Sequence, residues 1–139
     1  LGLGNTTAYS SPVQVGALTD WSTIGGGAEA GYGVKTNGTL WSWGSGVSGQ
    51  LGLGSITYYS SPVQVGALTT WTRIAGGQKW ATGVRTDGYL FAWGDNAWGQ
   101  LGQGNTTNTS SPVQVGALTT WLKSETGTRA YSLFGFKSP

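Results

Sequence analysis

The sequence contains no cysteine, no histidine and no methionine, and only 9% of its 139 residues are charged. Without cysteine the chain can form neither disulfides nor thiolate metal sites. Without histidine or cysteine the common nucleophile–base pairs of covalent catalysis cannot be assembled. No stretch approaches the ~20 apolar residues that a membrane span needs. We therefore predict no catalytic residues, no metal site, no cofactor and no membrane insertion.

The few charges are also scattered. Seven basic and five acidic residues give a net charge of +2, so the basic balance rests on a small number of groups. Nucleic-acid binding normally gathers lysine and arginine on one face, and no such cluster is present in the sequence. We interpret these charges as a solvated rim and predict no nucleic-acid partner.

Glycine is abundant, with 26 residues, and it recurs in a fixed register of 50 residues. The segment Gly49–Gly54 returns as Gly99–Gly104, and the chain opens inside another copy at residues 1–4. The nine residues from Ser11 to Thr19 recur unchanged 50 and 100 positions later. Such self-similarity is typical of a solenoid, a propeller or another stacked array. The chain is therefore predicted to be one segment, 1–139, with units 1–50, 51–100 and 101–139.

Each unit contains short alternating stretches separated by glycine, asparagine or aspartate, which favours a small antiparallel sheet. Four strands are expected in the second unit, near Val63–Val65, Trp71–Gly76, Ala81–Thr86 and Tyr89–Gly94. The dipeptides Asn37-Gly38 and Asp87-Gly88 favour a type I′ hairpin before the last of these strands.

Three features of a unit predict where its strands lie. The last strand places two aromatic residues on one face, Trp41 and Trp43 in the first unit, which predicts an adhesive layer between sheets. Gly33, and its equivalent in the second unit, marks a close approach of backbones and predicts the strand nearest the axis. Pro12 and Pro62 predict a peripheral strand, because proline lacks the N–H that a central strand must donate.

Together, the glycine pair, the Asn/Asp-Gly turn, the Leu-aromatic-small-Trp-Gly strand, the Gly-Gln-Leu-Gly-x-Gly loop and the Pro-x-x-Val strand resemble the repeat of the regulator of chromosome condensation (RCC1) family. The resemblance covers essentially the whole chain. It implies four-stranded antiparallel blades in an all-β propeller, usually of seven blades. The family repeat usually carries a histidine at positions that here are Ala30, Trp80 and Ala130, which weakens any transfer of nucleotide-exchange activity.

Fewer than three units are present, whereas seven would need about 350 residues, so the expected fold is a partial ring. Three arrangements are open: a piece of a longer array, several copies completing one ring, or an open stack. The missing initiating methionine and the start inside a loop favour the first. The last copy diverges after Trp121, and we expect its blade to lack the Trp-Gly strand. The expected partners are further blades of the same chain or other copies.

Two tryptophans do not repeat and are candidates for ligand binding. The first unit has Ala30 and Ser48 where the second has Trp80 and Trp98. Gln78, Asp95 and Asn96 are near them in sequence and could supply neutral hydrogen bonds to a glycan or a protein receptor. The alternative interpretation is that both indoles pack against a neighbouring blade.

The acidic residues do not suggest an enzyme, since they are few, and Asp87 and Asp95, which share the second unit, each have a turn or loop role. The sequence therefore favours a non-catalytic structural or adhesive display module. Uniform, polar, uncharged copies resemble the RCC1-like repeats of prokaryotic and phage surface proteins, so a virion-fibre or cell-surface location is expected. The alternative is a regulatory module that acts on a small GTPase or on chromatin.

Overall fold

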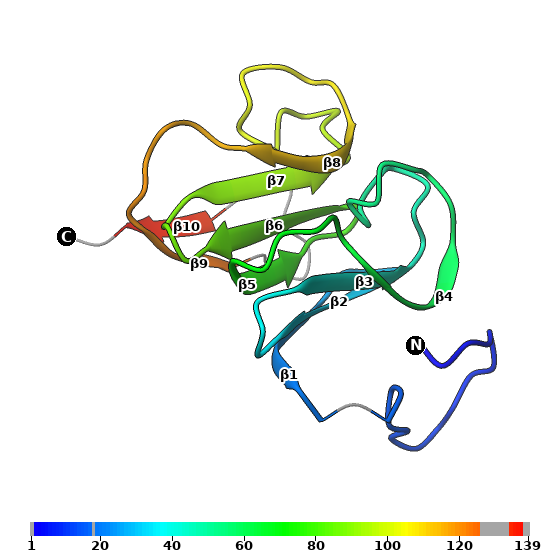
Figure 1. The fold of residues 1–139 in the computed structure, drawn as a ribbon. Coiled ribbons are helices and arrows are strands. Elements are labelled where there is room, and N and C mark those ends of the chain that lie inside the picture. Colours follow the sequence, from blue (N-terminus) through cyan, green and yellow to red (C-terminus); the bar gives the residue numbers. More distant parts are fainter. Residues whose placement is uncertain (1, 18, 126–133, 138–139) are drawn as a thin grey trace.

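The computed structural model describes residues 2–17, 19–125 and 134–137, and within these ranges the chain forms ten strands and no helix. The strands are β1 (Trp21–Gly26), β2 (Ala30–Lys35), β3 (Leu40–Gly44), β4 (Tyr59–Gln64), β5 (Trp71–Gly76), β6 (Trp80–Arg85), β7 (Leu90–Gly94), β8 (Thr109–Gln114), β9 (Trp121–Glu125) and β10 (Phe134–Lys137). Figure 1 shows them as separate sheets that follow one another along the chain. The all-β prediction is confirmed.

Two of the sheets are four-stranded, antiparallel and built to one pattern. Their strand orders are β1-β2-β3-β4 and β5-β6-β7-β8, and a third sheet pairs β9 with β10. The first two share one register, because Ile24 faces Gly33 in the first sheet and Ile74 faces Gly83 in the second. The predicted four-stranded unit is therefore confirmed, and its repetition extends to individual residue pairs.

Each of the two four-stranded sheets takes its outer strand from the next copy of the repeat. The expected grouping placed the strand near Val63–Val65 at the start of the second unit, and this was wrong. That segment is β4, which pairs with β3 of the first sheet through Ser42 and Val63. The pairing satisfies the backbone edge that β3 would otherwise expose. Pro62 lies on this edge strand as predicted, whereas Pro12 lies outside any strand.

The glycines in the middle of the sheet do not lie on the edge strand opposite the prolines, which is the strand that the prediction places nearest the axis. Gly33 and Gly83 lie on β2 and β6, the second strands, while the edges opposite the prolines are β1 and β5, which contact each other. Glycine is required at Gly33 because a tryptophan ring packs directly against its backbone. A Cβ atom at Gly33 would lie 2.5 Å from Cζ3 of Trp21, so the bare backbone makes room for that ring.

The predicted type I′ hairpins were also wrong. In the described residues only glycines have positive φ, so Gly38 qualifies and Asn37 does not. The N–H of Gly38 donates to the carbonyl of Lys35 at 2.9 Å, and the N–H of Lys35 donates to that of Thr39 at 3.0 Å. This is a type I turn followed by a left-handed glycine. Asn37 favours it because its Oδ1 accepts from the N–H of Thr39 at 3.1 Å.

The core lies between the first and second sheets. Tyr32, Val34 and Leu40 of the first sheet pack in one buried cluster with Trp71 and Trp93 of the second. The hydroxyl of Tyr32 and the indole N–H of Trp93 both donate to the backbone carbonyl of Gln50, each at 2.9 Å. The aromatic face of a sheet therefore does pack against its neighbour, as predicted.

Backbone hydrogen bonds also cross between units at intervals of one repeat. The N–H of Gly54 donates to the carbonyl of Ser110 at 2.8 Å, as that of Gly4 does to Ser60. The carbonyl of Gly38 accepts from the N–H of Trp71 at 3.0 Å. These contacts join each loop or turn to the strand of the following sheet, and they set the spacing of the array.

The Tyr32 hydroxyl generates the first prediction. Burial raises the pKa of Tyr32 far above its ordinary value of 10.0. Above about pH 10 the unfolded chain loses this proton while the folded chain keeps it, so stability is fully present below that pH and falls as pH rises. Tyr32→Phe should lower the free energy of unfolding by about 1 kcal/mol at neutral pH. The variant should also no longer show the decrease in the free energy of unfolding above about pH 10 that this hydroxyl causes. Denaturant titrations at several pH values measure both effects, with the exposed Tyr58→Phe as the unaffected control.

A second prediction concerns the other face of the first sheet. Trp21 and Trp43 are only partly buried there, whereas their equivalents Trp71 and Trp93 are 3% and 0% exposed. Partly exposed aromatic faces of this kind favour association. We expect the 139-residue chain by itself to be oligomeric in light scattering. A stable, cooperatively folding monomer of 14.4 kDa would contradict the prediction.

Candidate functional site

The candidate residues gather at one end of the second sheet. The turn between β5 and β6 and the loop between β7 and β8 meet there, because the N–H of Asp95 donates to the carbonyl of Lys79 at 2.8 Å. Gln78 is exposed in the turn, and Trp98 is exposed in the loop. We call this region, comprising residues 77–79 and 95–108, the loop end of the second unit.

Trp98 is the most exposed large apolar side chain among those described, with 79% of its surface accessible. Its backbone is nevertheless fixed. The N–H of Trp98 donates to Oε1 of Gln100 at 2.9 Å, and Nε2 of Gln100 donates to Asp95 at 2.8 Å. The same brace occurs in the first unit, where the N–H of Ser48 donates to Gln50 at 2.8 Å. The second unit therefore presents an indole on a loop position that this array holds in place.

Asn96 stabilises the loop from inside. It is fully buried, and its Nδ2 donates to the carbonyls of Asn105 at 2.9 Å and Thr107 at 3.1 Å. Its Oδ1 accepts from the N–H of Leu101 at 3.0 Å, and its own N–H donates to Asn108 at 2.7 Å. The carboxamide is thus occupied by the loop. The structure places Asn96 in support of the surface and not on it.

Trp80 lies in the core, with only 2% of its surface exposed. It begins β6 and packs with Ala92 and Leu101, and partly buried Val115 covers the same cluster. A Cβ atom at Gly77 would lie 2.5 Å from its ring, so glycine is needed beside it. The sequence pairs Trp80 with Trp98 as candidates, but the structure separates them into one packed and one presented indole.

The first unit has its large side chain at a different position on the same strand face. Ala30 and Tyr32 lie on one face of β2, because residues two apart in a strand point to the same side. Their equivalents on β6 are Trp80 and Thr82, so the large residue moves by two positions between units while the small residue takes its place. Tyr32 and Trp80 are both buried. The third position of this series, Ala130, lies outside the described residues.

A group of exposed side chains that was not predicted from the sequence lies at the equivalent loop end of the first unit, residues 27–29 and 45–58. Val47, Ile56 and Tyr58 are 41%, 66% and 66% exposed. A Cβ atom at Gly46 would lie 2.2 Å from the carbonyl oxygen of Thr57, so this loop packs by its backbone. A comparison of the two copies could have identified these residues, because the second unit has Ala97, Thr106 and Asn108 at the three equivalent positions.

Two pairs of charged residues have structural roles. Arg85 pairs with Asp87 in the hairpin turn, and Lys35 pairs with Asp20 at 3.5 Å while lying 4.6 Å from the ring centre of Trp41. Asp87 and Asp95 lie at opposite ends of β7, so they do not form an acid–base pair. The residues described include no group of acidic side chains able to hold a metal. Nor do they include a helix that could cross a membrane.

A sequence profile and three solved structures resemble this chain. The profile of the regulator of chromosome condensation (RCC1) repeat matches residues 37–82 and 87–129. No curated protein is significantly similar in sequence. Human WBSCR16 has a TM-score of 0.74 at 20% identity over 91% of this chain. Prp20p from Saccharomyces cerevisiae, in a study of its binding to Gsp1p and histones, has a TM-score of 0.73 at 17% identity over 91%.

A structure of yeast RCC1 (Prp20) bound to Kap60 gives a TM-score of 0.73 at 19% identity over 88% of this chain. The chain spans about a third of each of these proteins, namely 36%, 33% and 32% of their lengths. At these identities the similarity shows the fold. The four-stranded sheets are therefore blades of a partial β-propeller.

The different burial of the two indoles is directly testable. Trp80→Ala should lower the free energy of unfolding by about 3 to 5 kcal/mol, because it removes a buried indole, whereas Trp98→Ala should leave it nearly unchanged. Adding Thr82→Tyr to Trp80→Ala restores the pair used by the first unit and should recover part of the loss. Equal destabilisation by the two single substitutions in thermal or denaturant unfolding would contradict this assignment.

Proposed function

This chain belongs to the RCC1 repeat family, and on that premise we propose that it is a non-catalytic β-propeller segment that displays a binding surface at its loop ends. The family match covers most of the chain, and the fold similarity agrees with it. Propellers bind partners through the loops at the ends of their blades, because the sheets position those loops rigidly. The loop ends described above have this position.

The observation that carries the proposal is Trp98. An indole with 79% of its surface exposed contributes almost nothing to the core, yet its loop is held by Gln100 and Asn96. A rigid aromatic ring loses little conformational entropy on binding and provides a flat contact area. Gln78 and Asp95 lie near it with polar side chains. The same loop end also carries the exposed ammonium group of Lys79. The surface fits a polar ligand that accepts and donates hydrogen bonds, either a glycan or a polar face of a receptor protein.

We propose that this module belongs to a virion fibre or a cell surface. The support is the uniform, weakly charged composition of the copies, since a display array needs stable repeated units and little electrostatic steering. Paired charges such as Lys35 with Asp20 agree with that view. The blades beyond this chain are the expected intramolecular or intermolecular neighbours.

A second candidate function is regulation through protein contacts. It is favoured by the fold similarity to Prp20p, which was studied for binding to Gsp1p and histones. The low charge of this chain offers little attraction for nucleosomes or for a charged GTPase surface. We therefore expect no acceleration of nucleotide release from a small GTPase, and a measurable acceleration would favour this second function.

The display function is tested on a glycan array and on a panel of surface receptor proteins, using the chain and two variants. Trp98→Ser installs the residue of the first unit and should abolish binding with folding intact. Trp41→Phe, which copies Phe91 of the second unit at a residue far from the loop end, is the matched control and should bind normally. Binding that survives Trp98→Ser would overturn the role of this surface.

A further inference from the structure

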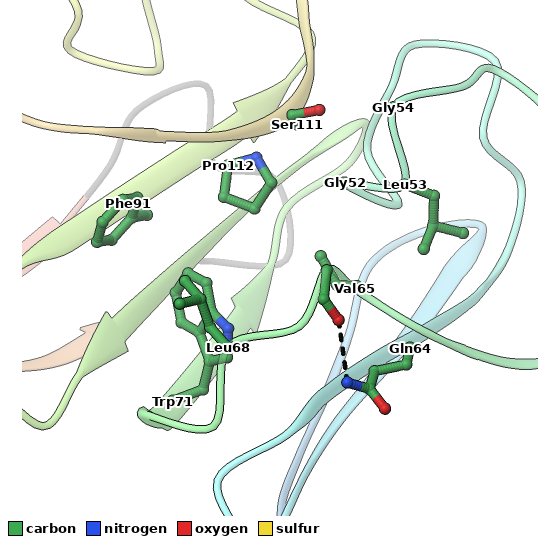
Figure 2. A pocket seen from close by; sticks show the side chains of 11 residues that line it. Gly52, Leu53, Gly54, Gln64, Val65, Leu68, Trp71, Phe91, Ser111 and Pro112 are labelled. Carbon is green, nitrogen blue, oxygen red and sulfur yellow. Dashed lines mark hydrogen bonds between the residues drawn. The ribbon is translucent and has the colours of Figure 1, made fainter.

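Two hollows of different polarity lie between the first two sheets. One is an apolar groove of about 310 Å³, lined by residues that include Leu53, Val65 and Phe91 (Figure 2). The other is a polar cleft of about 580 Å³, where the turn between β2 and β3 meets the start of β5. This polar cleft is at the opposite end of the sheets from the loop end. Nothing in the function proposed above uses it.

Backbone contacts hold the walls of the polar cleft in place. The N–H of Trp71 donates to the carbonyl of Gly38 at 3.0 Å, which joins the turn of the first sheet to the first strand of the second. Gly38 has a φ of 78°, and a Cβ atom there would overlap the carbonyl of Thr69. The N–H of Thr36 donates to the carbonyl of Asp20 at 2.8 Å, and the equivalent bond recurs one unit later. The cleft is therefore preformed.

The lining of the cleft consists mainly of groups that form hydrogen bonds. Asn37 contributes a carboxamide whose Oδ1 accepts from the N–H of Thr39 at 3.1 Å, so its Nδ2 remains as a donor. Trp71, the one large apolar side chain among the described lining residues, is only 3% exposed. Exposed hydroxyl groups come from both sheets, namely those of Ser22, Thr36, Thr69 and Thr86. The cleft thus offers donors and acceptors on both walls.

Arg73 adds a positive charge that has no acidic partner in the described part of the chain. It is exposed on β5, and its guanidinium lies 3.5 Å from a threonine hydroxyl of β1, at the outer limit of a hydrogen bond. No acidic side chain is among the described residues that line the cleft. The ion pairs found in the described ranges use other cations, Lys35 with Asp20 and Arg85 with Asp87. An unpaired guanidinium beside these hydroxyl groups favours an anionic ligand.

A comparison of the units shows which residues set the charge of this cleft. The first unit has Thr23 where the second has Arg73, and the turn residue Asn37 becomes Asp87. The next cleft along the array therefore has an acid at its turn, and this acid pairs with Arg85. In the cleft between the first and second sheets the cation faces a neutral turn. An anion there would be attracted by Arg73 without repulsion from the turn.

The free charge and the hydroxyl groups together restrict the ligand. A guanidinium matches the two oxygens of a carboxylate with two parallel hydrogen bonds. Lys35 also lines the cleft, but it is 8% exposed and paired, so a dianion such as phosphate would find one free positive charge. Serine and threonine hydroxyls both donate and accept hydrogen bonds, and they can pair with the hydroxyl groups of a sugar. These features favour a ligand with a single carboxylate among hydroxyl groups.

We propose that this cleft binds a saccharide that carries one carboxylate group, as a uronic acid unit does. The carboxylate pairs with Arg73, and the ring hydroxyls bond to the threonine and asparagine side chains of the two walls. A volume of about 580 Å³ lies in the range of small-molecule sites. An acidic peptide fits less well, because its apolar side-chain atoms would gain little from burial against polar walls.

The test uses cellobiouronic acid as the probe, and cellobiose as a control that has a hydroxymethyl group in place of the carboxylate. Isothermal titration calorimetry on the intact chain should show about tenfold tighter binding of the acid. The sequence contains three arginines, so labelling arginine with ¹⁵N gives a simple NMR spectrum. The Nε–H resonance of Arg73, identified by its loss in Arg73→Thr, should shift with cellobiouronic acid and not with cellobiose.

Matched variants separate the cleft from the fold. Arg73→Thr installs the residue of the first unit and should weaken the acid about tenfold or more, because a charge-assisted pair is lost. Arg73→Lys keeps the charge without the planar fork and should weaken binding less. Asn37→Asp installs the residue of the second unit and should weaken binding by repelling the carboxylate. Asn5→Asp is the control, since it makes the same change at an exposed residue outside the cleft.

Several outcomes overturn the proposal. These are no binding of cellobiouronic acid up to millimolar concentration, binding that leaves the Arg73 resonance unmoved, equal binding of cellobiose, or equal weakening by Asn37→Asp and Asn5→Asp. Sodium acetate that binds as tightly as cellobiouronic acid would show a site for any carboxylate and also overturn it, as would equal binding of acetyl-triglutamate-amide.

The loop end is separated from the cleft by one further variant. Trp98→Ser removes the exposed ring of the loop end and should leave the binding of cellobiouronic acid unchanged. Loss of binding in Trp98→Ser, with the Arg73 resonance unmoved in the unsubstituted chain, would move the saccharide to the loop end and overturn the assignment of the cleft. Failure of the cleft variants to weaken binding therefore leaves the display function at the loop end standing.

Discussion

The backbone carbonyl of Gln50 is the point on which the packing of the two sheets depends. It accepts one hydrogen bond from Tyr32 of the first sheet and one from Trp93 of the second. Both donors are buried, so each requires this acceptor, and the acceptor is in place only when the loop that carries it is folded. The loop in turn is held by Gln50 through the N–H of Ser48. Loop, sheet and neighbouring sheet therefore form as one unit.

The repetition of this interface explains which residue positions differ between copies. On one face of the second strand, each unit keeps one large and one small side chain but exchanges their positions. Ala30 and Tyr32 correspond to Trp80 and Thr82, so the large side chain moves by two residues along the strand. Loop positions that meet only solvent change freely, and Ser48 becomes Trp98. Variation in the core is compensated within the sheet, whereas variation on the loops is available for recognition.

The structure offers two surfaces of different chemistry. The loop end presents one exposed ring among polar groups, which suits a ligand that approaches from solvent and brings hydroxyl or amide groups. The groove between the first two sheets has aromatic and apolar walls and no charged side chain, so it disfavours charged ligands. Because blades can differ at these surfaces while sharing their core, one array can present several such sites.

The sequence by itself determined the period, the all-β class, the aromatic face of each sheet and the edge position of Pro62, because these follow from spacing and from the backbone chemistry of single residues. Only the tertiary structure decided that β4 joins the preceding sheet, that the turn at Asn37 is type I, and that Gly33 makes room for Trp21. It also separated Trp80 from Trp98, which are equally prominent as departures from the repeat. The physical reason is that burial and strand exchange depend on contacts between units, and the pattern within one unit does not contain those contacts.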